Sequence, residues 1–520
     1  MRRLCLPLLL VAAPALAAPP AGFDARVEAL RQQIGVPGMA VAIVESGKTV
    51  LARGYGVRKL GAPDSVDADT IFMTGSTGKA FTTAALATLV DAGRIGWDDK
   101  VADRLPGFQM YDPWVTREMT IRDLLVHRSG LGLGEGDLLF VPRTNIPRAE
   151  AVRRLRYLKP ATSFRSGFAY DNVLYMVAGQ LIEAVTGQRW EDYVREHVLL
   201  PAGMTDSTTE NVRRFADPDR AYPHARTSEA VRGAGPLGPL DERDALGDSA
   251  APAGGLAISA NDMAKWLTLQ LAHGRLPGGG RLFSEAAHDE MWKPEILQPV
   301  DPLPDSLKPT QPLFDTYAFG WEVRDYRGAK IVWHSGAVLG FQSVVVMLPE
   351  KNVGFAIEIN SEDSPILLGL MDELLDHYLG LPADDWPAKF VAYKQDRLAA
   401  AEKMLAGKAV APAKVGPSLP LDRYVGVYAD PWYGKISISR RGAGLAVDFL
   451  STPRMSGPLD HWQYDSFVVH FTDRTIEPGY LTFAIDADGH VSQVTMKPVS
   501  PLADFSYDYQ DLLFKPSADR

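Results

Sequence analysis

The chain has 520 residues, of which 46% are hydrophobic and 23% charged, and its formal net charge is −10 at pH 7. At about 150 residues per domain, this length predicts roughly two to four domains of ordinary globular composition. The acidic balance argues against a nucleic-acid partner, because such proteins carry a basic surface. No apolar run reaches the roughly 18 residues of a membrane-spanning helix, which excludes a protein with several membrane spans.

The N-terminus has the pattern of an export signal. Two arginines precede a short apolar stretch, Leu4 to Ala13, and Ala15-Leu16-Ala17 supplies a cleavage site of small residues. We therefore expect residues 1–18 to be removed and the mature protein to be periplasmic or secreted. The only cysteine, Cys5, belongs to this signal, so the mature chain is expected to fold without disulfides.

Hydrophobic patterning then predicts a domain that contains both helices and strands. In chain order we expect strands at 39–44 and 49–51, helices at 76–92 and 172–186, and strands at 344–347 and 353–357. Residues 121–126 fit either a short helix or a strand. Residues 206–250 are polar and turn-rich, and residues 294–314 are rich in proline, so both are expected to be long surface loops.

The composition changes near residue 383. An amphipathic stretch at 388–406, with Pro387 at its start and Gly407 at its end, predicts one helix. Residues 411–420 hold three prolines among small residues and predict a linker. Short alternating strands are expected at 424–428, 435–438, 445–449, 467–471, 480–483 and 491–497. Their spacing predicts a small antiparallel barrel or sandwich of about 100 residues.

Several familiar motifs are missing from the sequence. No two histidines have the H-x-x-x-H spacing and the mature chain has no cysteine, so no local zinc motif exists. The G-x-S-x-G elbow of other hydrolases is also missing. Two further residues have open interpretations: His127 lines a pocket or stabilises its own loop, and Trp114 covers a cleft or lies in a turn.

A serine and a lysine lie one helical turn apart at the start of the helix expected over 76–92. Ser76 and Lys79, in Gly75-Ser76-Thr77-Gly78-Lys79, share one face of that helix. A serine hydroxyl is a poor nucleophile unless a base takes its proton, and a desolvated lysine can be that base. The helix N-terminus also directs main-chain N–H groups at a developing oxyanion. Because S-x-x-K occurs about once by chance in a chain this long, the pair needs support from elsewhere.

Two later segments supply that support, although each alone has an ordinary structural interpretation. Tyr170 and Asn172 lie at the head of the second expected helix, where tyrosine can move a proton and asparagine can bind a substrate carbonyl and a lysine. Trp333-His334-Ser335-Gly336-Ala337 is expected at a strand edge that a substrate backbone can approach. The N–H of Ala337 could then join that of Ser76 in an oxyanion hole.

In order and placement the three segments resemble the signature of the serine β-lactamase and penicillin-binding-protein superfamily, S-x-x-K, then Y-x-N or S-D-N, then K-T-G. Their spacing is similar to that of the class C β-lactamase branch. The resemblance covers roughly residues 22–382 and extends to Leu125 to Leu131, Ala253 to Leu256 and Tyr317 to Trp321. The C-terminal strands resemble the lipocalin-like domain that some serine peptidases of this branch carry.

This resemblance implies a fold and a domain organisation. An α+β hydrolase domain, in which helices flank an antiparallel sheet beside an all-helical lobe, would occupy residues 19–382. A helix and linker would follow at 383–420, and a small antiparallel β-barrel at 421–520. No metal ion or organic cofactor is implied, and the partner would be a small-molecule or peptide substrate rather than a nucleic acid or a membrane.

Catalytic roles follow from the same resemblance. Ser76 would attack a carbonyl carbon and form an acyl-enzyme. Lys79 and Tyr170 would share the role of general base, and Tyr170 would protonate the leaving group. Asn172 would hold the substrate amide.

The third segment departs from the β-lactamase pattern at one position. His334 stands where β-lactamases carry lysine, whereas Gly336 and Ala337 would still form the strand edge that pairs with the substrate. Histidine is mostly neutral at pH 7, which puts efficient hydrolysis of β-lactams in doubt. The appended barrel favours a peptidase or amidase, acting on D-amino-acid-containing or small peptides, over a carboxylesterase. The alternatives are a weak β-lactamase and a non-catalytic protein that binds cell-wall or peptide ligands.

Overall fold

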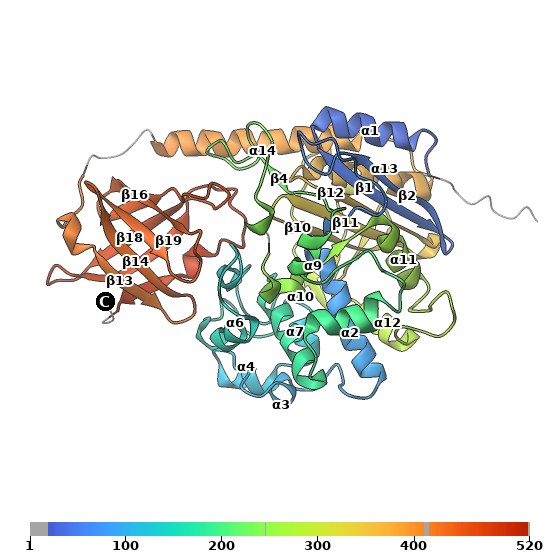
Figure 1. The fold of residues 1–520 in the computed structure, drawn as a ribbon, viewed down its shortest axis with the longest axis horizontal. Coiled ribbons are helices and arrows are strands. Elements are labelled where there is room, and N and C mark those ends of the chain that lie inside the picture. Colours follow the sequence, from blue (N-terminus) through green and yellow to red (C-terminus); the bar gives the residue numbers. More distant parts are fainter. Residues whose placement is uncertain (1–18, 245, 410–414, 518–520) are drawn as a thin grey trace, which may run out of the picture.

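The computed structural model describes residues 19–244, 246–409 and 415–517. The expected export signal and the first part of the expected linker lie outside these residues. The described chain forms a large body of helices and strands and a C-terminal β-barrel, and helix α14 (Trp386–Ala409) extends from the first toward the second (Figure 1). Within the described ranges, no helix is both long and apolar enough to cross a membrane.

An antiparallel sheet of eight strands forms the centre of the large body in the described part of the chain. Its strand order is β2-β1-β12-β11-β10-β9-β8-β7. The strands are β1 (Gly38–Glu45), β2 (Lys48–Gly56), β7 (Ile296–Gln298), β8 (Asp315–Tyr317), β9 (Glu322–Tyr326), β10 (Ala329–Val338), β11 (Phe341–Leu348) and β12 (Val353–Ile359). Val41 lies opposite Ile357, so an N-terminal strand completes the sheet beside a late one.

Helices flank this sheet and form a separate lobe in the same body. Those against the sheet are α1 (Phe23–Ile34), α11 (Ala260–Leu271) and α13 (Ser364–Leu379). The remaining helices of the body are α2 (Lys79–Asp91), α3 (Val101–Arg104), α4 (Pro113–Glu118), α5 (Ile121–Leu124), α6 (Arg148–Arg154), α7 (Val173–Thr186), α8 (Trp190–Val194), α9 (Asn211–Ala216), α10 (Ala251–Gly254) and α12 (Glu285–Met291). The expected α+β fold, with helices around an antiparallel sheet and a helical lobe, is confirmed.

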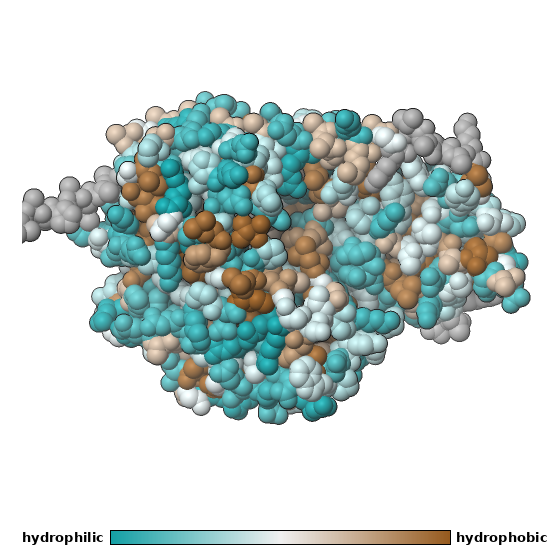
Figure 2. All heavy atoms as spheres, turned by 180° about the vertical axis from the view of Figure 1, so that it is seen from behind, coloured by the Kyte–Doolittle hydropathy of each residue, from teal (hydrophilic) through white to brown (hydrophobic). Residues whose placement is uncertain are grey.

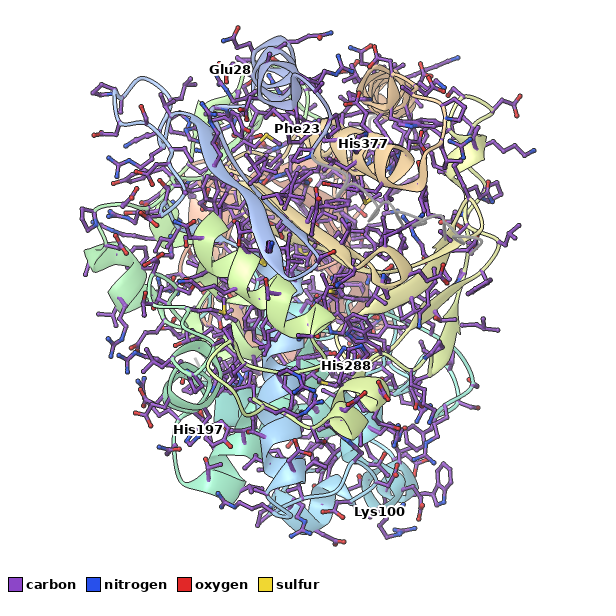
Figure 3. All side chains as sticks on the ribbon, turned by 90° about the vertical axis from the view of Figure 1, so that its right-hand side faces the viewer. Phe23, Glu28, Lys100, His197, His288 and His377 are labelled. Atoms are coloured by element: carbon purple, nitrogen blue, oxygen red, sulfur yellow. The ribbon has the colours of Figure 1, made fainter. Side chains whose placement is uncertain are left out.

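The two faces of the sheet belong to two hydrophobic cores, because successive side chains of a strand point to opposite faces. Val41 of β1 packs into the core shared with α1 and α13, whereas its neighbour Ala42 packs into the core shared with α2, α7 and α11. In Figure 3, Phe23 points from α1 toward the sheet and Glu28 lies on the outer side of that helix. On the face seen in Figure 2, apolar groups gather in the middle of the large body, toward its junction with the barrel.

The C-terminal strands close into a barrel. They are β13 (Gly426–Asp430), β14 (Gly434–Arg441), β15 (Gly444–Phe449), β16 (Ser456–Gln463), β17 (Ser466–Val469), β18 (Gly479–Ile485), β19 (Val491–Pro498) and β20 (Leu513–Pro516). Because β20 pairs with both β19 and β13, the element is a barrel rather than a sandwich. Sequence patterning missed β16, whose Gly457 and Pro458 interrupt the alternation, and β20, which has four residues.

Some expected elements differ in detail. The first expected helix begins as a 3-10 turn, Gly75–Gly78, and becomes an α-helix at Lys79. The segment 121–126 begins with a short helix, Ile121–Leu124, and ends in a turn, because Thr120 and Asp123 make a capping box at the helix start. The two expected loops are not wholly irregular: 206–250 contains α9 and the strand pair β4 (His224–Ala225) and β5 (Gly238–Pro239), and 294–314 contains β7.

Asp123 is expected to be essential for the stability of the lobe. Its fully buried carboxylate accepts hydrogen bonds from Arg128 Nε at 2.8 Å and Arg165 Nε at 3.0 Å. We expect Asp123→Ala to lower the free energy of unfolding by about 3 kcal/mol, because Arg128 and Arg165 both lose a buried carboxylate and Thr120 loses its partner in the capping box. Urea unfolding of this variant and of Asp103→Ala, at an exposed position on α3, would measure the effect. Equal, small losses in both variants would contradict it.

Candidate active site

A cavity of about 750 Å³ opens where the sheet, the helical lobe, α14 and the barrel meet. Five residues singled out by the sequence line it: Ser76, Tyr170, Asn172, His334 and Ala337. Lys79 lies beneath Ser76 and is fully buried. Segments more than 250 residues apart in the chain therefore meet at one cavity.

Lys79 makes three hydrogen bonds that point its amine at the serine. Its Nζ lies 2.9 Å from Ser76 Oγ, 2.7 Å from Asn172 Oδ1 and 2.9 Å from the Ala253 carbonyl oxygen. Ser76 lies in the 3-10 turn and Lys79 begins α2, so one helical turn aligns the two side chains. Asn172 reaches the same amine from the residue that precedes α7.

Burial lowers the pKa of Lys79 to about 7, although the nearby carboxyls of Asp137 and Asp171 oppose the shift. A substantial fraction of the lysine is therefore uncharged at neutral pH. The neutral amine keeps two N–H groups, which suffice for the oxygens of Asn172 and Ala253. Its lone pair then faces the Ser76 hydroxyl, which is the arrangement that a general base needs.

The Tyr170 hydroxyl lies next to this pair. The Lys79 ammonium is 4.7 Å from the centre of the Tyr170 ring. The hydroxyl is buried and has no hydrogen-bond partner among the described residues. Burial raises the pKa of Tyr170 well above its usual value, and the proximity of Ser76 offsets only part of that rise. The phenol is therefore protonated at neutral pH and free to donate.

His127 packs against the Tyr170 ring and does not line the cavity. It is fully buried, and its ring centre lies 4.1 Å from that of Tyr170. The main-chain N–H of Asp171 donates to its Nδ1 at 3.1 Å, and burial holds the pKa of His127 well below its usual value. The neutral imidazole thus stabilises its loop, which decides between the two interpretations. Trp114 is half-exposed at the start of α4 and does not line the cavity either.

His334 is also neutral. It is buried on β10, and burial together with nearby Lys79 lowers its pKa to about 3. Its Nδ1 donates to the Ser335 carbonyl, so its Nε2 accepts from the Tyr317 hydroxyl at 2.9 Å. His334 therefore brings no positive charge to the cavity, in contrast to a lysine at this position.

Strand β10 approaches the Ser76 turn closely and leaves one edge open. A Cβ on Gly336 would lie 1.9 Å from the Thr74 carbonyl oxygen and 3.1 Å from the Ser76 nitrogen, so only glycine fits. A Cβ on Gly75 would lie 2.5 Å from the Ala337 nitrogen, which brings the two expected oxyanion donors together. Residues 334–338 pair with β11, whereas β9 pairs only up to residue 333. A substrate backbone can therefore lie along this free edge.

Sequence reasoning missed several residues of the cavity. Tyr317 orients His334, and Asp137, which burial gives a pKa of about 7, accepts a hydrogen bond from Asn172. Phe505 lines the cavity from the barrel, more than 300 residues after Tyr170 in the chain. The Tyr317 segment was noted only as part of a resemblance, and nothing in the local sequence around Phe505 marks it as a site residue.

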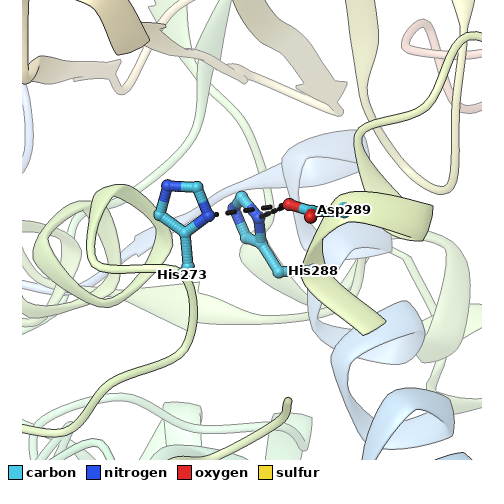
Figure 4. A group of neighbouring side chains, drawn as sticks. All are labelled: His273, His288 and Asp289. Carbon is cyan, nitrogen blue, oxygen red and sulfur yellow. Dashed lines mark hydrogen bonds and ion pairs between the residues drawn. The ribbon is translucent and has the colours of Figure 1, made fainter. Parts of the chain in front are cut away.

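One side-chain group in the described residues has the spacing of a metal site, and it lies elsewhere. His273, His288 and Asp289 bring potential ligand atoms within 4.8 Å of one another (Figure 4). Asp289 Oδ1 lies 3.6 Å from His273 Nδ1 and 3.3 Å from His288 Nδ1, which is also the geometry of a plain His–Asp contact. None of the three residues lines the cavity, so the site chemistry does not involve them.

The fold and this serine-centred cavity define a serine hydrolase of the β-lactamase and penicillin-binding-protein type. Residues 23–367 match the Beta-lactamase family, and the chain belongs to that family. Residues 410–516 match a domain of unknown function, DUF3471.

Individual proteins agree with this assignment. Unguisins hydrolase ungD' of Aspergillus campestris is 31% identical over 424 residues, which are 78% of this chain and 74% of the relative. Penicillin-binding protein 4 of Amycolatopsis lactamdurans is 30% identical over 374 residues, covering 69% of this chain and 91% of the relative. The octameric penicillin-binding protein homologue from Pyrococcus abyssi has a similar fold, with a TM-score of 0.59, 22% identity and coverage of 92% and 97%.

Proposed function

We propose that this serine hydrolase is exported and cleaves amide bonds of small or D-amino-acid-containing peptides through an acyl-enzyme at Ser76. The observation that carries the proposal is the contact of Ser76 Oγ with a buried lysine whose pKa is about 7. A largely neutral amine in contact with a serine hydroxyl is the pairing that a serine nucleophile requires.

Acylation follows from the geometry of the cavity. Neutral Lys79 takes the hydroxyl proton of Ser76 while Oγ bonds to the substrate carbonyl carbon. The carbonyl π electrons move to its oxygen, and the main-chain N–H groups of Ser76 and Ala337 stabilise that oxyanion. Tyr170 donates its phenolic proton to the leaving nitrogen as the C–N bond breaks, and it regains a proton from the Lys79 ammonium. Because burial keeps Tyr170 protonated and Lys79 partly neutral, we assign the acid role to the first and the base role to the second.

Deacylation reverses these proton transfers with water in place of the amine. Tyr170 passes its phenolic proton to neutral Lys79 as it takes a proton from the water, whose oxygen attacks the ester carbonyl carbon. The oxyanion then collapses, the ester C–O bond breaks, and Ser76 Oγ regains its proton from the Lys79 ammonium. Asn172 keeps its amide oxygen on the lysine throughout, which holds the amine in line with Ser76.

The choice of substrate class rests on two features. The open edge at residues 334–338 suits an extended peptide backbone, which can add to the sheet as a further strand. The neutral His334 offers no charge for the carboxylate of a β-lactam. Relatives named as an Unguisins hydrolase and as a penicillin-binding protein support a hydrolase of this family.

Covalent labelling would test the proposal. Intact-mass spectrometry after treatment with a fluorophosphonate should show one adduct, which peptide mapping places on Ser76 and which Ser76→Ala abolishes. An unlabelled wild-type protein that is folded by circular dichroism would overturn it. Turnover of D- and L-aminoacyl p-nitroanilides, p-nitrophenyl acetate and nitrocefin then separates peptidase, esterase and β-lactamase activity, and only preference for an amide supports the proposal.

Export is tested separately. Expression of the full 520-residue chain in a Gram-negative host should deliver the protein to the periplasm, with an N-terminus close to residue 18 by mass. Retention of the uncleaved chain in the cytoplasm would contradict export without affecting the catalytic proposal.

A further inference from the structure

One loop of the barrel lines part of the cavity. Residues 499–508, which we call the barrel loop, leave β19 at Pro498 and run to the 3-10 turn Tyr509–Asp511. The members of this loop that line the cavity are Leu502, Asp504, Phe505, Ser506 and Tyr507. The substrate cavity is therefore not enclosed by the hydrolase domain alone.

The loop is anchored to the lobe by hydrogen bonds from main-chain donors. The carboxyl of Asp508 is fully buried and accepts from the main-chain N–H of Gly136 at 2.6 Å and of Leu138 at 3.1 Å. Gly134 permits the close approach, because a Cβ there would lie 2.6 Å from the Phe505 carbonyl oxygen. Buried polar contacts of this kind hold the loop in one position against the lobe.

A hydrogen-bonded chain leads from the loop to the nucleophile. Ser506 Oγ donates to Asp137 Oδ2 at 2.8 Å, and Asn172 Nδ2 donates to the same oxygen at 2.8 Å. Because its Nδ2 is held there, Asn172 turns its Oδ1 toward Lys79 Nζ at 2.7 Å. Asp137 thus orients the Asn172 amide, and the Ser506 hydroxyl helps to hold the Asp137 carboxyl in place.

Phe505 packs against Tyr170, the proposed general acid. Its ring stands edge-on to the Tyr170 ring, with 5.9 Å between ring centres, and 41% of its surface is exposed. The exposed part faces a cavity that it helps to line. An apolar substrate group beside Tyr170 would therefore contact this ring and gain from covering it.

We propose that the barrel loop is a working part of the active site, in which Ser506 positions Asn172 and Lys79 and Phe505 selects substrates with a large apolar group. The inference rests on the proposed nucleophile Ser76. It gives the C-terminal barrel a specificity role that its classification as a domain of unknown function leaves open.

Full-length Ser506 variants test the positioning role. Ser506→Ala should label with diisopropyl fluorophosphate about tenfold more slowly than the wild type, because the Asp137 carboxyl that orients the Asn172 amide loses one of its two hydrogen bonds. Ser506→Thr keeps a hydroxyl and should recover most of that rate. Ser492→Ala, at an exposed barrel serine that bonds only within its hairpin, should match the wild type. Equal rates in Ser506→Ala and Ser492→Ala would overturn the positioning role.

Two further comparisons test whether the barrel loop forms one wall of the substrate cavity. Phe505→Ala should raise the half-saturating concentration of a long-chain alkyl fluorophosphonate several-fold and leave that of diisopropyl fluorophosphate unchanged. Gly134→Ala should slow labelling by pushing the barrel loop away. Gly107→Ala has a comparable positive φ with nothing near its added Cβ, so it is the control for backbone strain alone.

The outcomes separate this inference from the proposed function. A wild-type protein that does not label at Ser76 defeats the proposed function. If the wild type labels, Phe505→Ala binds both probes as the wild type does, and Gly134→Ala labels as quickly as Gly107→Ala, the role of the barrel loop is rejected. The proposed function then still stands. Thermal unfolding of every variant, with a melting temperature within about 3 °C of the wild type, ensures that the rates compare folded enzymes.

Discussion

Replacing Lys79 with alanine is expected to slow the acylation of Ser76 by about a thousandfold. The amine is the only side-chain nitrogen or carboxylate among the described residues with a hydrogen bond to Ser76 Oγ, and the neighbouring Tyr170 phenol is already protonated, so the lysine is the group that takes the hydroxyl proton. General-base catalysis contributes about 100- to 10,000-fold in enzymes, and a serine without its base keeps only the contribution of the oxyanion donors. The rate of fluorophosphonate labelling, followed by mass spectrometry, measures this loss.

The pH dependence provides a second measure of the same role. With the pKa of Lys79 at about 7, the wild-type labelling rate should fall about tenfold per pH unit below pH 7 and level off above about pH 8. Below its pKa the lysine is an ammonium that cannot accept a proton, so the loss occurs on the acid side. Lys79→Arg should behave as Lys79→Ala does, because arginine stays charged.

Lys100→Ala is the matched control, since Lys100 pairs with Glu118 and is not among the residues that line the cavity; Figure 3 shows it at the lower end of the view. It should retain the wild-type rate and pH profile. A Lys79→Ala variant that labels as quickly as Lys100→Ala, or a wild-type rate that is flat between pH 6 and pH 9, would exclude Lys79 as the base.

Tyr170→Phe is expected to discriminate between leaving groups. The turnover of amides should fall by about 100-fold or more, whereas that of p-nitrophenyl esters should fall by less than about tenfold. An amine must be protonated as it leaves, but p-nitrophenolate leaves without a proton. The phenylalanine ring keeps the contacts of Tyr170 with His127 and Phe505, so the change removes only the hydroxyl.

Tyr157→Phe, at a half-exposed tyrosine outside the cavity, controls for loss of a hydroxyl elsewhere. Steady-state kcat and KM for one amide and one ester, measured on both variants, test the assignment. Equal losses on amide and ester would mean that Tyr170 acts before the leaving group departs, as a base or as a positioning group.

Sequence patterning reached the proposed catalytic centre because its main features are local. Ser76 and Lys79 are one helical turn apart, and a helix aligns residues at that spacing regardless of its surroundings. The barrel was also predictable, since short alternating strands between turn residues leave few other architectures. Its two missed strands, β16 and β20, are those in which proline or shortness obscures the alternation.

Long-range contacts could not be predicted in the same way. The approach of Gly336 to Thr74 depends on how β10 lies against the Ser76 turn, more than 250 residues away in sequence. The position of Phe505 depends on the docking of a whole barrel. Neither contact has a periodic pattern or a spacing rule that a single sequence displays.

By itself, the sequence determined the order of the three motif segments and the appended β domain, because these follow from residue identity and local periodicity, while the α+β class and the missing lysine at position 334 followed from the family resemblance that those motifs carry. Only the tertiary structure decided the protonation states and the boundary of the cavity. Burial lowers the pKa of Lys79 and raises that of Tyr170, and burial is a property of the packed chain. The barrel loop enters the site for the same reason: Ser506 and Asp508 find their partners only after both domains have folded and docked.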